Sequence, residues 1–148
     1  MKRTRGSKDF LQKHSLSLAA SSIVLLWIVL YIASDPSTHL GAFFGNAIAD
    51  WTGIVVTVLM TKHLYEKGSP ESKQPEGVLP SRVREIVLEH SLTIFLVLTG
   101  TAWIVVFALM DANSRWGQVI GNVVSEWTQI LGMVLITKRL IEVGSKTP

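Results

Sequence analysis

Four long apolar segments constrain this chain more than any other feature of its sequence. They cover residues 16–34, 40–64, 91–110 and 116–140. Each holds roughly the 20 residues that a helix needs to cross a hydrocarbon core ~30 Å thick at ~1.5 Å per residue. Only 17% of the chain is charged, against about 25% in soluble domains. We therefore predict an all-α membrane protein with four transmembrane helices and little chain left for a soluble domain.

The positions of the basic residues predict how the chain is oriented. All but one of its 14 Lys and Arg residues lie before the first apolar segment, from the end of the second to the start of the third, or from the end of the fourth onward; Arg115 is the exception. Such an excess on one side is typical of the cytoplasmic side of a membrane protein. We expect both termini to be cytoplasmic. We expect membrane lipids as partners, with anionic lipids compatible with this basic side, and no nucleic acid.

The chain repeats itself at an offset of 76 residues. The motif "HSLSL" from His14 corresponds to "HSLTI" from His90, and "GNAIADWTGI" from Gly45 corresponds to "GNVVSEWTQI" from Gly121. Each copy holds two apolar segments, so each is predicted to be a helical hairpin preceded by a short amphipathic lead-in. Both hairpins begin and end on the same side. We therefore predict parallel repeats related by a pseudo-two-fold axis along the membrane normal.

The repeat divides the chain into five predicted parts. They are a basic amphipathic N-terminal segment (1–13), the first hairpin (14–66), a cytoplasmic linker (67–83), the second hairpin (84–142) and a C-terminal tail (143–148). The linker is rich in Pro, Gly, Ser and charged residues, which is typical of an exposed connection.

Small residues recur at every fourth position in the second helix of each hairpin. At about 100° per residue they form one stripe along each helix. This pattern is typical of close helix–helix contact in membranes; the alternative is that the glycines line a pore or let a ligand approach the backbone. The residues are Gly41, Gly45 and Ala49 in the first copy, and Gly117, Gly121 and Ser125 in the second.

A polar stripe runs beside the small one, and it carries one carboxyl group in each copy. Asp50 and Glu126 are expected near the middle of the membrane, where an acid costs roughly 2.5–3.5 kcal/mol on the insertion scale. Two hypotheses stay open: a proton or cation site with further oxygen ligands, or carboxyl groups that tie helices together. The exchange of Asp for Glu argues against a strict coordination geometry. The other residues of the stripe are Asn46, Thr57 and Thr61, with Asn122, Gln129 and Thr137.

Four tryptophans occupy corresponding positions in the two copies. Trp51 and Trp127 are predicted to point away from the polar stripe, toward lipid, a neighbouring helix or a second subunit. Tryptophan usually prefers the membrane interface, so its deep placement here raises the prospect of a subunit contact. Trp27 and Trp103 are assigned to helix packing, with lipid or subunit contact as the alternative.

No enzyme signature is found in the sequence. The absence of cysteine excludes disulfides, thiolate metal sites and thiol catalysis. The four histidines do not have metal-ligand spacing, and no phosphate-binding loop or hydrolase motif is present. We expect no enzymatic activity, no metal site and no cofactor.

Short motifs resemble those of an uncharacterised bacterial family of small tandem-repeat membrane proteins. The similar stretches are "KHSLSL", "EHSLTI", "SEWTQ" and "EKGSPESK"; members of that family carry "SEF" or "SEW" with a following Gln, and "QKGSPESK". The resemblance implies a bacterial inner-membrane location and marks Ser125, Glu126, Gln129 and, in the first copy, Asp50. The first copy departs from the pattern with "ADWTG", and the family supplies no activity.

Three functions remain as hypotheses from the sequence. The first is a small homo-oligomer, a dimer or larger, that conducts or translocates a proton or small cation, because the charges inside the membrane are acidic. The second is a structural or accessory subunit that packs against a larger membrane complex. The third is a protein that binds lipid or another hydrophobic ligand between its hairpins.

Overall fold

The structure is a computed structural model that describes residues 3–65, 67, 82–138 and 140. These residues form helices and no strand. Four helical segments, namely residues 14–33 of the first helix and the whole of α2, α4 and α5, are long and apolar enough to cross a membrane. The predicted all-α architecture is therefore confirmed, and it fits a multi-pass membrane protein. The helices are α1 (Arg3–Ala33), α2 (His39–His63), α3 (Arg82–Glu89), α4 (Ser91–Leu109) and α5 (Arg115–Ile136).

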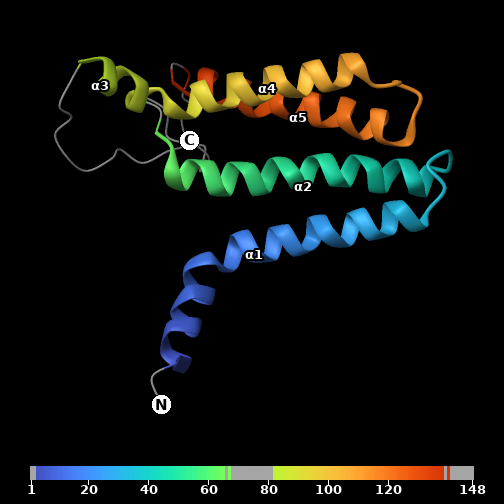
Figure 1. The fold of residues 1–148 in the computed structure, drawn as a ribbon, viewed down its shortest axis with the longest axis horizontal. Coiled ribbons are helices and arrows are strands. Elements are labelled where there is room, and N and C mark those ends of the chain that lie inside the picture. Colours follow the sequence, from blue (N-terminus) through green and yellow to red (C-terminus); the bar gives the residue numbers. More distant parts are fainter. Residues whose placement is uncertain (1–2, 66, 68–81, 139, 141–148) are drawn as a thin grey trace.

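The second helix of each predicted hairpin lies at the centre of the bundle. Helix α2 packs against α1 on one side and α5 on the other, and α5 packs against α4. In Figure 1 the N-terminal part of α1 turns away from the bundle, while the rest of α1 runs alongside α2. The connections at residues 34–38 and 110–114 share one end, called the loop end here. The other end, where α2 finishes and α4 begins, is called the terminal end.

The two loop-end connections start their helices in the same way. Thr38 precedes α2, and its hydroxyl accepts a hydrogen bond from the Gly41 amide at 3.1 Å. Ser114 precedes α5, and its hydroxyl accepts one from the Gly117 amide at 3.0 Å. Such N-caps satisfy amides that have no partner within the helix. In α2 and in α5, one of the free amides of the first turn is therefore bonded by a side chain.

Gly41 and Gly117 belong to these connections and not to a helix–helix contact. A Cβ atom at Gly41 would collide with the carbonyl oxygen of Asp35, and one at Gly117 with that of Asp111. The preceding loop therefore folds back onto the first turn of the helix, and only glycine leaves room for it. This differs from the prediction that both glycines serve close packing between helices.

Gly45 and Gly121 lie where the two helices of each hairpin approach each other closely. A Cβ atom at Gly45 would lie 3.2 Å from the ring of Tyr31, and one at Gly121 would lie 3.0 Å from the ring of Phe107. The glycines therefore let an aromatic ring of the first helix rest on the backbone of the second. Ala49, the third small residue of its stripe, is completely buried.

The main apolar core lies between α2, α4 and α5. It is built from Ala49 on α2, Leu92 and Leu96 on α4, and Val123, Trp127 and Val134 on α5. A smaller cluster of Tyr31, Ile48 and Val119 joins α1, α2 and α5 nearer the loop end. Most other large apolar side chains of α1 and α4 are exposed, as expected for helices whose outer faces meet lipid tails.

Arg115 joins the two hairpins at the loop end. Its guanidinium donates hydrogen bonds to the carbonyl oxygens of Ile32 at 3.1 Å and Ser34 at 2.9 Å, and it lies 5.5 Å from the centre of the Tyr31 ring. The Tyr31 hydroxyl in turn donates to the Arg115 carbonyl oxygen at 2.7 Å. A cation at the carbonyl end of a helix also interacts favourably with the helix dipole. This contact gives a structural reason for an arginine at the loop end, where the two connections otherwise carry the acids Asp35 and Asp111.

We predict that Arg115→Ala destabilises the protein by about 1–3 kcal/mol, the range for losing hydrogen bonds to a charged group. The stability of Arg115→Lys should lie between that of the native protein and that of Arg115→Ala, because lysine keeps the charge but not the planar set of donors. The measurement is thermal unfolding of the purified protein in detergent. Equal unfolding temperatures for all three proteins would contradict this role.

Candidate functional site

The polar stripes of α2 and α5 meet halfway along both helices. Together they line an open recess of about 220 Å³, called the polar recess here. Its lining residues are Asn46 and Asp50 from α2, and Asn122, Ser125, Glu126 and Gln129 from α5. All six side chains are polar. The sequence predicts two separate polar stripes, and the contact between α2 and α5 makes them one site.

Two asparagines join the helices at the loop-end side of the recess. The Asn122 side-chain amide donates a hydrogen bond to the Asn46 side-chain oxygen. These two residues correspond to each other in the sequence repeat. In a hydrocarbon core such a bond between helices satisfies polar groups that have no water to bind.

The two carboxyl groups lie next to each other in the recess. Asp50 and Glu126 both line it, and they are close enough to interact electrostatically. Two carboxylates in one recess repel each other, so a bound proton or cation that reduces the repulsion is favoured there. Such a pair can hold a proton, or exchange it for a cation.

The two copies differ at two related positions: the acid is Asp50 in one and Glu126 in the other, and Gly53 in one corresponds to Gln129 in the other. A Cβ atom at Gly53 would lie 2.8 Å from Oε2 of Glu126, so the carboxyl group of the longer acid occupies space that glycine leaves empty. Gln129 corresponds to Gly53 in the sequence repeat, and it lines the recess with the shorter acid, Asp50. The longer acid therefore faces the smaller residue. This geometry explains how both acids reach one place despite their different lengths.

Ser125 has a different role from the one its spacing suggests. The small-residue pattern predicts that it packs between helices, but its side chain is exposed and lines the polar recess. Its counterpart Ala49 is the one in the core. The hydroxyl of Ser125 therefore adds to the polar surface around the carboxyl pair.

The three threonines of the predicted polar stripe lie outside the polar recess. Thr57 and Thr61 line a second cavity of about 290 Å³ between α2, α4 and α5, called the apolar cavity here. Glu126 and Gln129 line both spaces, so the recess and the cavity adjoin. Thr137 is buried just after α5, and its hydroxyl donates to the Met133 carbonyl oxygen at 2.7 Å.

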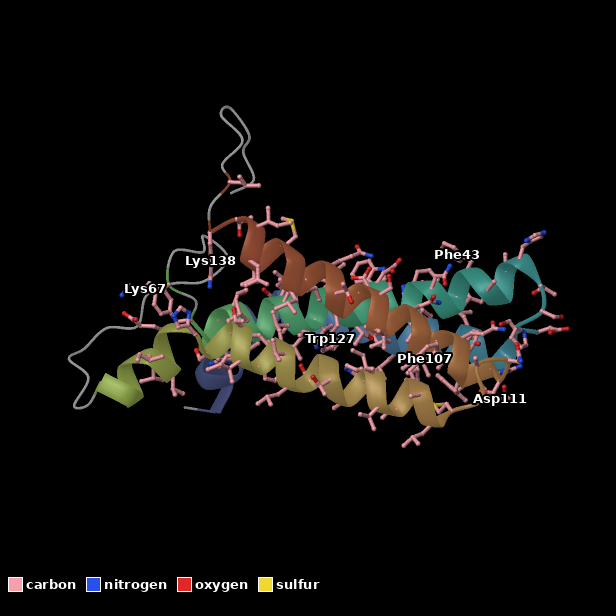
Figure 2. The ribbon with its side chains drawn as sticks, turned by 90° about the horizontal axis from the view of Figure 1, so that it is seen from above. Phe43, Lys67, Phe107, Asp111, Trp127 and Lys138 are labelled. Atoms are coloured by element: carbon pink, nitrogen blue, oxygen red, sulfur yellow. The ribbon has the colours of Figure 1, made fainter. Side chains whose placement is uncertain are left out.

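Trp127 lies inside the bundle, against a neighbouring helix, and not against lipid or a second subunit. It is only 5% exposed, and Figure 2 shows it in the middle of the bundle, far from Lys67 and Lys138 at the terminal end. Its indole nitrogen donates to the Thr99 hydroxyl at 2.8 Å, and its ring packs edge-on against Trp103 at 5.9 Å. Of the alternatives given above, contact with a neighbouring helix is the one that describes Trp127.

The sequence does contain a signal for the burial of Trp127. A Cβ atom at Gly100 would lie 3.3 Å from its indole ring, so glycine on α4 makes room for it. In the first copy, Val24 stands where Gly100 would be, and Ile23 stands in place of the hydrogen-bonding Thr99. The place that Trp127 occupies on α4 therefore has no equivalent on α1, and Trp51 is only half-buried.

Trp27 and Trp103 are half-buried and contact other aromatic residues within the bundle. Trp27 packs edge-on against Phe43 at 5.7 Å and stacks on Phe44 at 5.8 Å, which joins α1 to α2. Trp103 makes the contact with Trp127 described above. Both lie at helix–helix contacts inside the chain.

The recess does not resemble a site for a resident metal ion. Among the residues that the structure describes, no group of three or more His, Cys, Asp or Glu side chains could hold a metal ion. The carboxyl pair and the neighbouring amide oxygens are instead suited to a proton or a weakly held cation.

The chain matches no protein-family model, no curated protein and no solved structure. Its function is therefore inferred from the residues and the geometry described above.

We predict that Gly53→Ala destabilises the protein because the added methyl group displaces the Glu126 carboxyl group. Gly132→Ala is the matched control, since a Cβ atom there meets no other group within 4 Å. Alanine is the better helix former by about 1 kcal/mol, so the control should be at least as stable as the native chain. Gly53→Ala should be less stable than the control by about 1–2 kcal/mol.

Combining Gly53→Ala with Glu126→Asp should restore stability, because the shorter acid frees the space. A double-mutant cycle on thermal unfolding measures this coupling. Additive effects of the two changes would show that Glu126 does not depend on the space at Gly53.

Proposed function

We propose that this protein is a homo-oligomer of the bacterial inner membrane that passes protons or small monovalent cations by way of Asp50 and Glu126. The observation that carries the proposal is the open, wholly polar recess around the two adjacent carboxyl groups. A pair that only tied helices together would be expected in a dry, closed contact. An open polar recess instead favours a hydrated site, where a proton or cation can enter and leave.

The need to cover the polar recess supports an oligomer. Asp50, Ser125 and Gln129 are exposed on the single chain, although they lie near the middle of helices that fit a membrane span. Polar groups at that depth are found facing protein or a water-filled space, because lipid tails offer them no hydrogen bonds. A second copy that presents the same face would enclose a polar path between the two.

The contact between Asn46 and Asn122 supports the proposed pseudo-two-fold axis. Two residues that correspond in a repeat can touch only near the axis that relates the copies. The hydrogen bond between these side chains would therefore place the axis between α2 and α5, parallel to the membrane normal. The carboxyl pair then lies beside the same axis.

The basic residues support an orientation with both termini in the cytoplasm. Figure 2 shows Lys67 and Lys138 at the terminal end and Asp111 at the loop end. The positive-inside rule assigns the basic end to the cytoplasm. The bacterial inner membrane, and membership of the tandem-repeat family, follow from the motif resemblance and are part of the proposal.

A structural or accessory role in a larger complex is the second candidate. The Asn46–Asn122 hydrogen bond favours it, because that contact holds α2 and α5 together without moving an ion. In this case another protein would cover the polar recess. The two candidates differ in whether the purified chain is active alone.

We predict that the purified protein in liposomes conducts protons, sodium or potassium, and that Asp50→Asn combined with Glu126→Gln lowers the flux at least tenfold. Both substitutions keep the size of the side chain and remove its charge. Thr128→Val is the control, because Thr128 is exposed on the same helix but lies outside the polar recess. Flux that the double substitution leaves unchanged would refute the ion-path proposal and favour the accessory role.

We also predict that Ser125→Cys forms disulfide-linked dimers when membranes are treated with a mild oxidant. The native chain has no cysteine, so the introduced thiol is the only one available. Leu98→Cys on α4 is the control, since Leu98 is 65% exposed and lies outside the recess. Equal cross-linking at both positions, or none at Ser125→Cys, would argue against a second copy over the recess.

A further inference from the structure

The apolar cavity combines an apolar wall with one acidic group. Its volume of about 290 Å³ is close to the lower end of the range for small-molecule sites, roughly 300–1,000 Å³. The wall is formed mainly by Val56, Met60, Leu92, Leu96, Ile130 and Val134. Polar groups enter it only from two threonines, Glu126 and Gln129. Small-molecule sites share this design, in which an apolar pocket carries a few polar groups that orient the ligand.

The acidic group is at one end of the cavity. Glu126 lies midway along α5, and its carboxyl oxygen rests against Gly53 on α2. Thr61 and Leu92, which also line the cavity, lie near the terminal end of the bundle. The cavity therefore extends from the carboxyl pair toward the terminal end. Its charge and its apolar surface are separated along the membrane normal.

The cavity can be reached from outside the chain. Met133 lines it and is 51% exposed, so the cavity opens beside this residue on α5. Methionine is flexible and adapts to different apolar shapes. A ligand dissolved in the membrane could therefore enter from the side.

We propose that the apolar cavity binds a monovalent organic cation with an apolar body, whose charge is held at the Glu126 carboxylate. This inference rests on the proposed function, because Glu126 is the group that binds a cation in both proposals. Charge decides between ligand classes. An anion would be repelled by the carboxyl pair, and a lipid tail would fill the apolar wall but bring no charge to balance the acidic end of the cavity. A cation with an apolar body satisfies both surfaces.

Tetraphenylphosphonium and tetraphenylborate provide the test, because they have nearly the same size and opposite charge. Binding of each is measured by equilibrium dialysis with the purified full-length protein in detergent. We expect saturable binding of the phosphonium ion that Glu126→Gln weakens at least tenfold, and no saturable binding of the borate. Equal binding of the two ions, or phosphonium binding that Glu126→Gln leaves unchanged, would overturn the proposal.

A second pair of variants tests the cavity itself. Val56→Phe places a larger side chain in the cavity wall and should weaken phosphonium binding at least tenfold. Val105→Phe makes the same change on α4, at a side chain that is 50% exposed and outside the cavity, and should leave binding unchanged. Equal effects of the two substitutions would place the bound ion elsewhere and refute the assignment.

The two proposals fail in different ways. In one outcome, the protein fails to bind the phosphonium ion in every measurement and still passes protons or inorganic cations in a carboxyl-dependent way. That result would overturn only the proposal that the apolar cavity binds an organic cation. Carboxyl-dependent phosphonium binding without any ion flux would overturn the ion path and leave a binding protein for organic cations. Each result is obtained from the same purified protein.

Discussion

The contact between α2 and α5 is the interaction on which the rest of the structure depends. A hydrocarbon environment offers polar side chains no water, so they must find each other or a wet surface. Along these two helices an asparagine, an acid and their neighbours face each other over one short stretch. The outer helices α1 and α4 then pack on the central pair. The central contact therefore determines where the acids of the two membrane-length helices α2 and α5 lie.

The two copies differ where a large side chain needs space on a neighbouring helix. The longer acid, Glu126, meets the gap at Gly53, and Trp127 meets the gap at Gly100. In each case a large side chain on α5 is matched by a glycine on a neighbouring helix. The first copy lacks this match for Trp51, because Val24 stands where Gly100 would be. Two hairpins with similar sequences thus have different interiors, and only one copy contributes a tryptophan to the core.

Much of the fold could be predicted from the sequence, since four apolar segments of membrane length leave few alternatives. The meeting of Asp50 and Glu126 could be anticipated only as a consequence of the repeat. The burial of Trp127 could not be predicted from residue spacing, because the glycine that makes room for it lies on another helix and only the fold brings the two together. The loop contacts of Gly41 and the helix-end contacts of Arg115 depend in the same way on tertiary neighbours. Residue spacing reports which face of a helix a side chain lies on, but not what lies opposite.

The gap at Gly53 also fixes how far α5 can slide along α2. A shift of one helical turn, ~5.4 Å, would move Glu126 from Gly53 toward Ala49 or Thr57, where a side chain occupies the space. The same shift would separate Asn122 from Asn46. Gly53 and the Asn46–Asn122 pair therefore fix together how α5 is aligned along α2. This register brings the two carboxyl groups to the same height along the bundle.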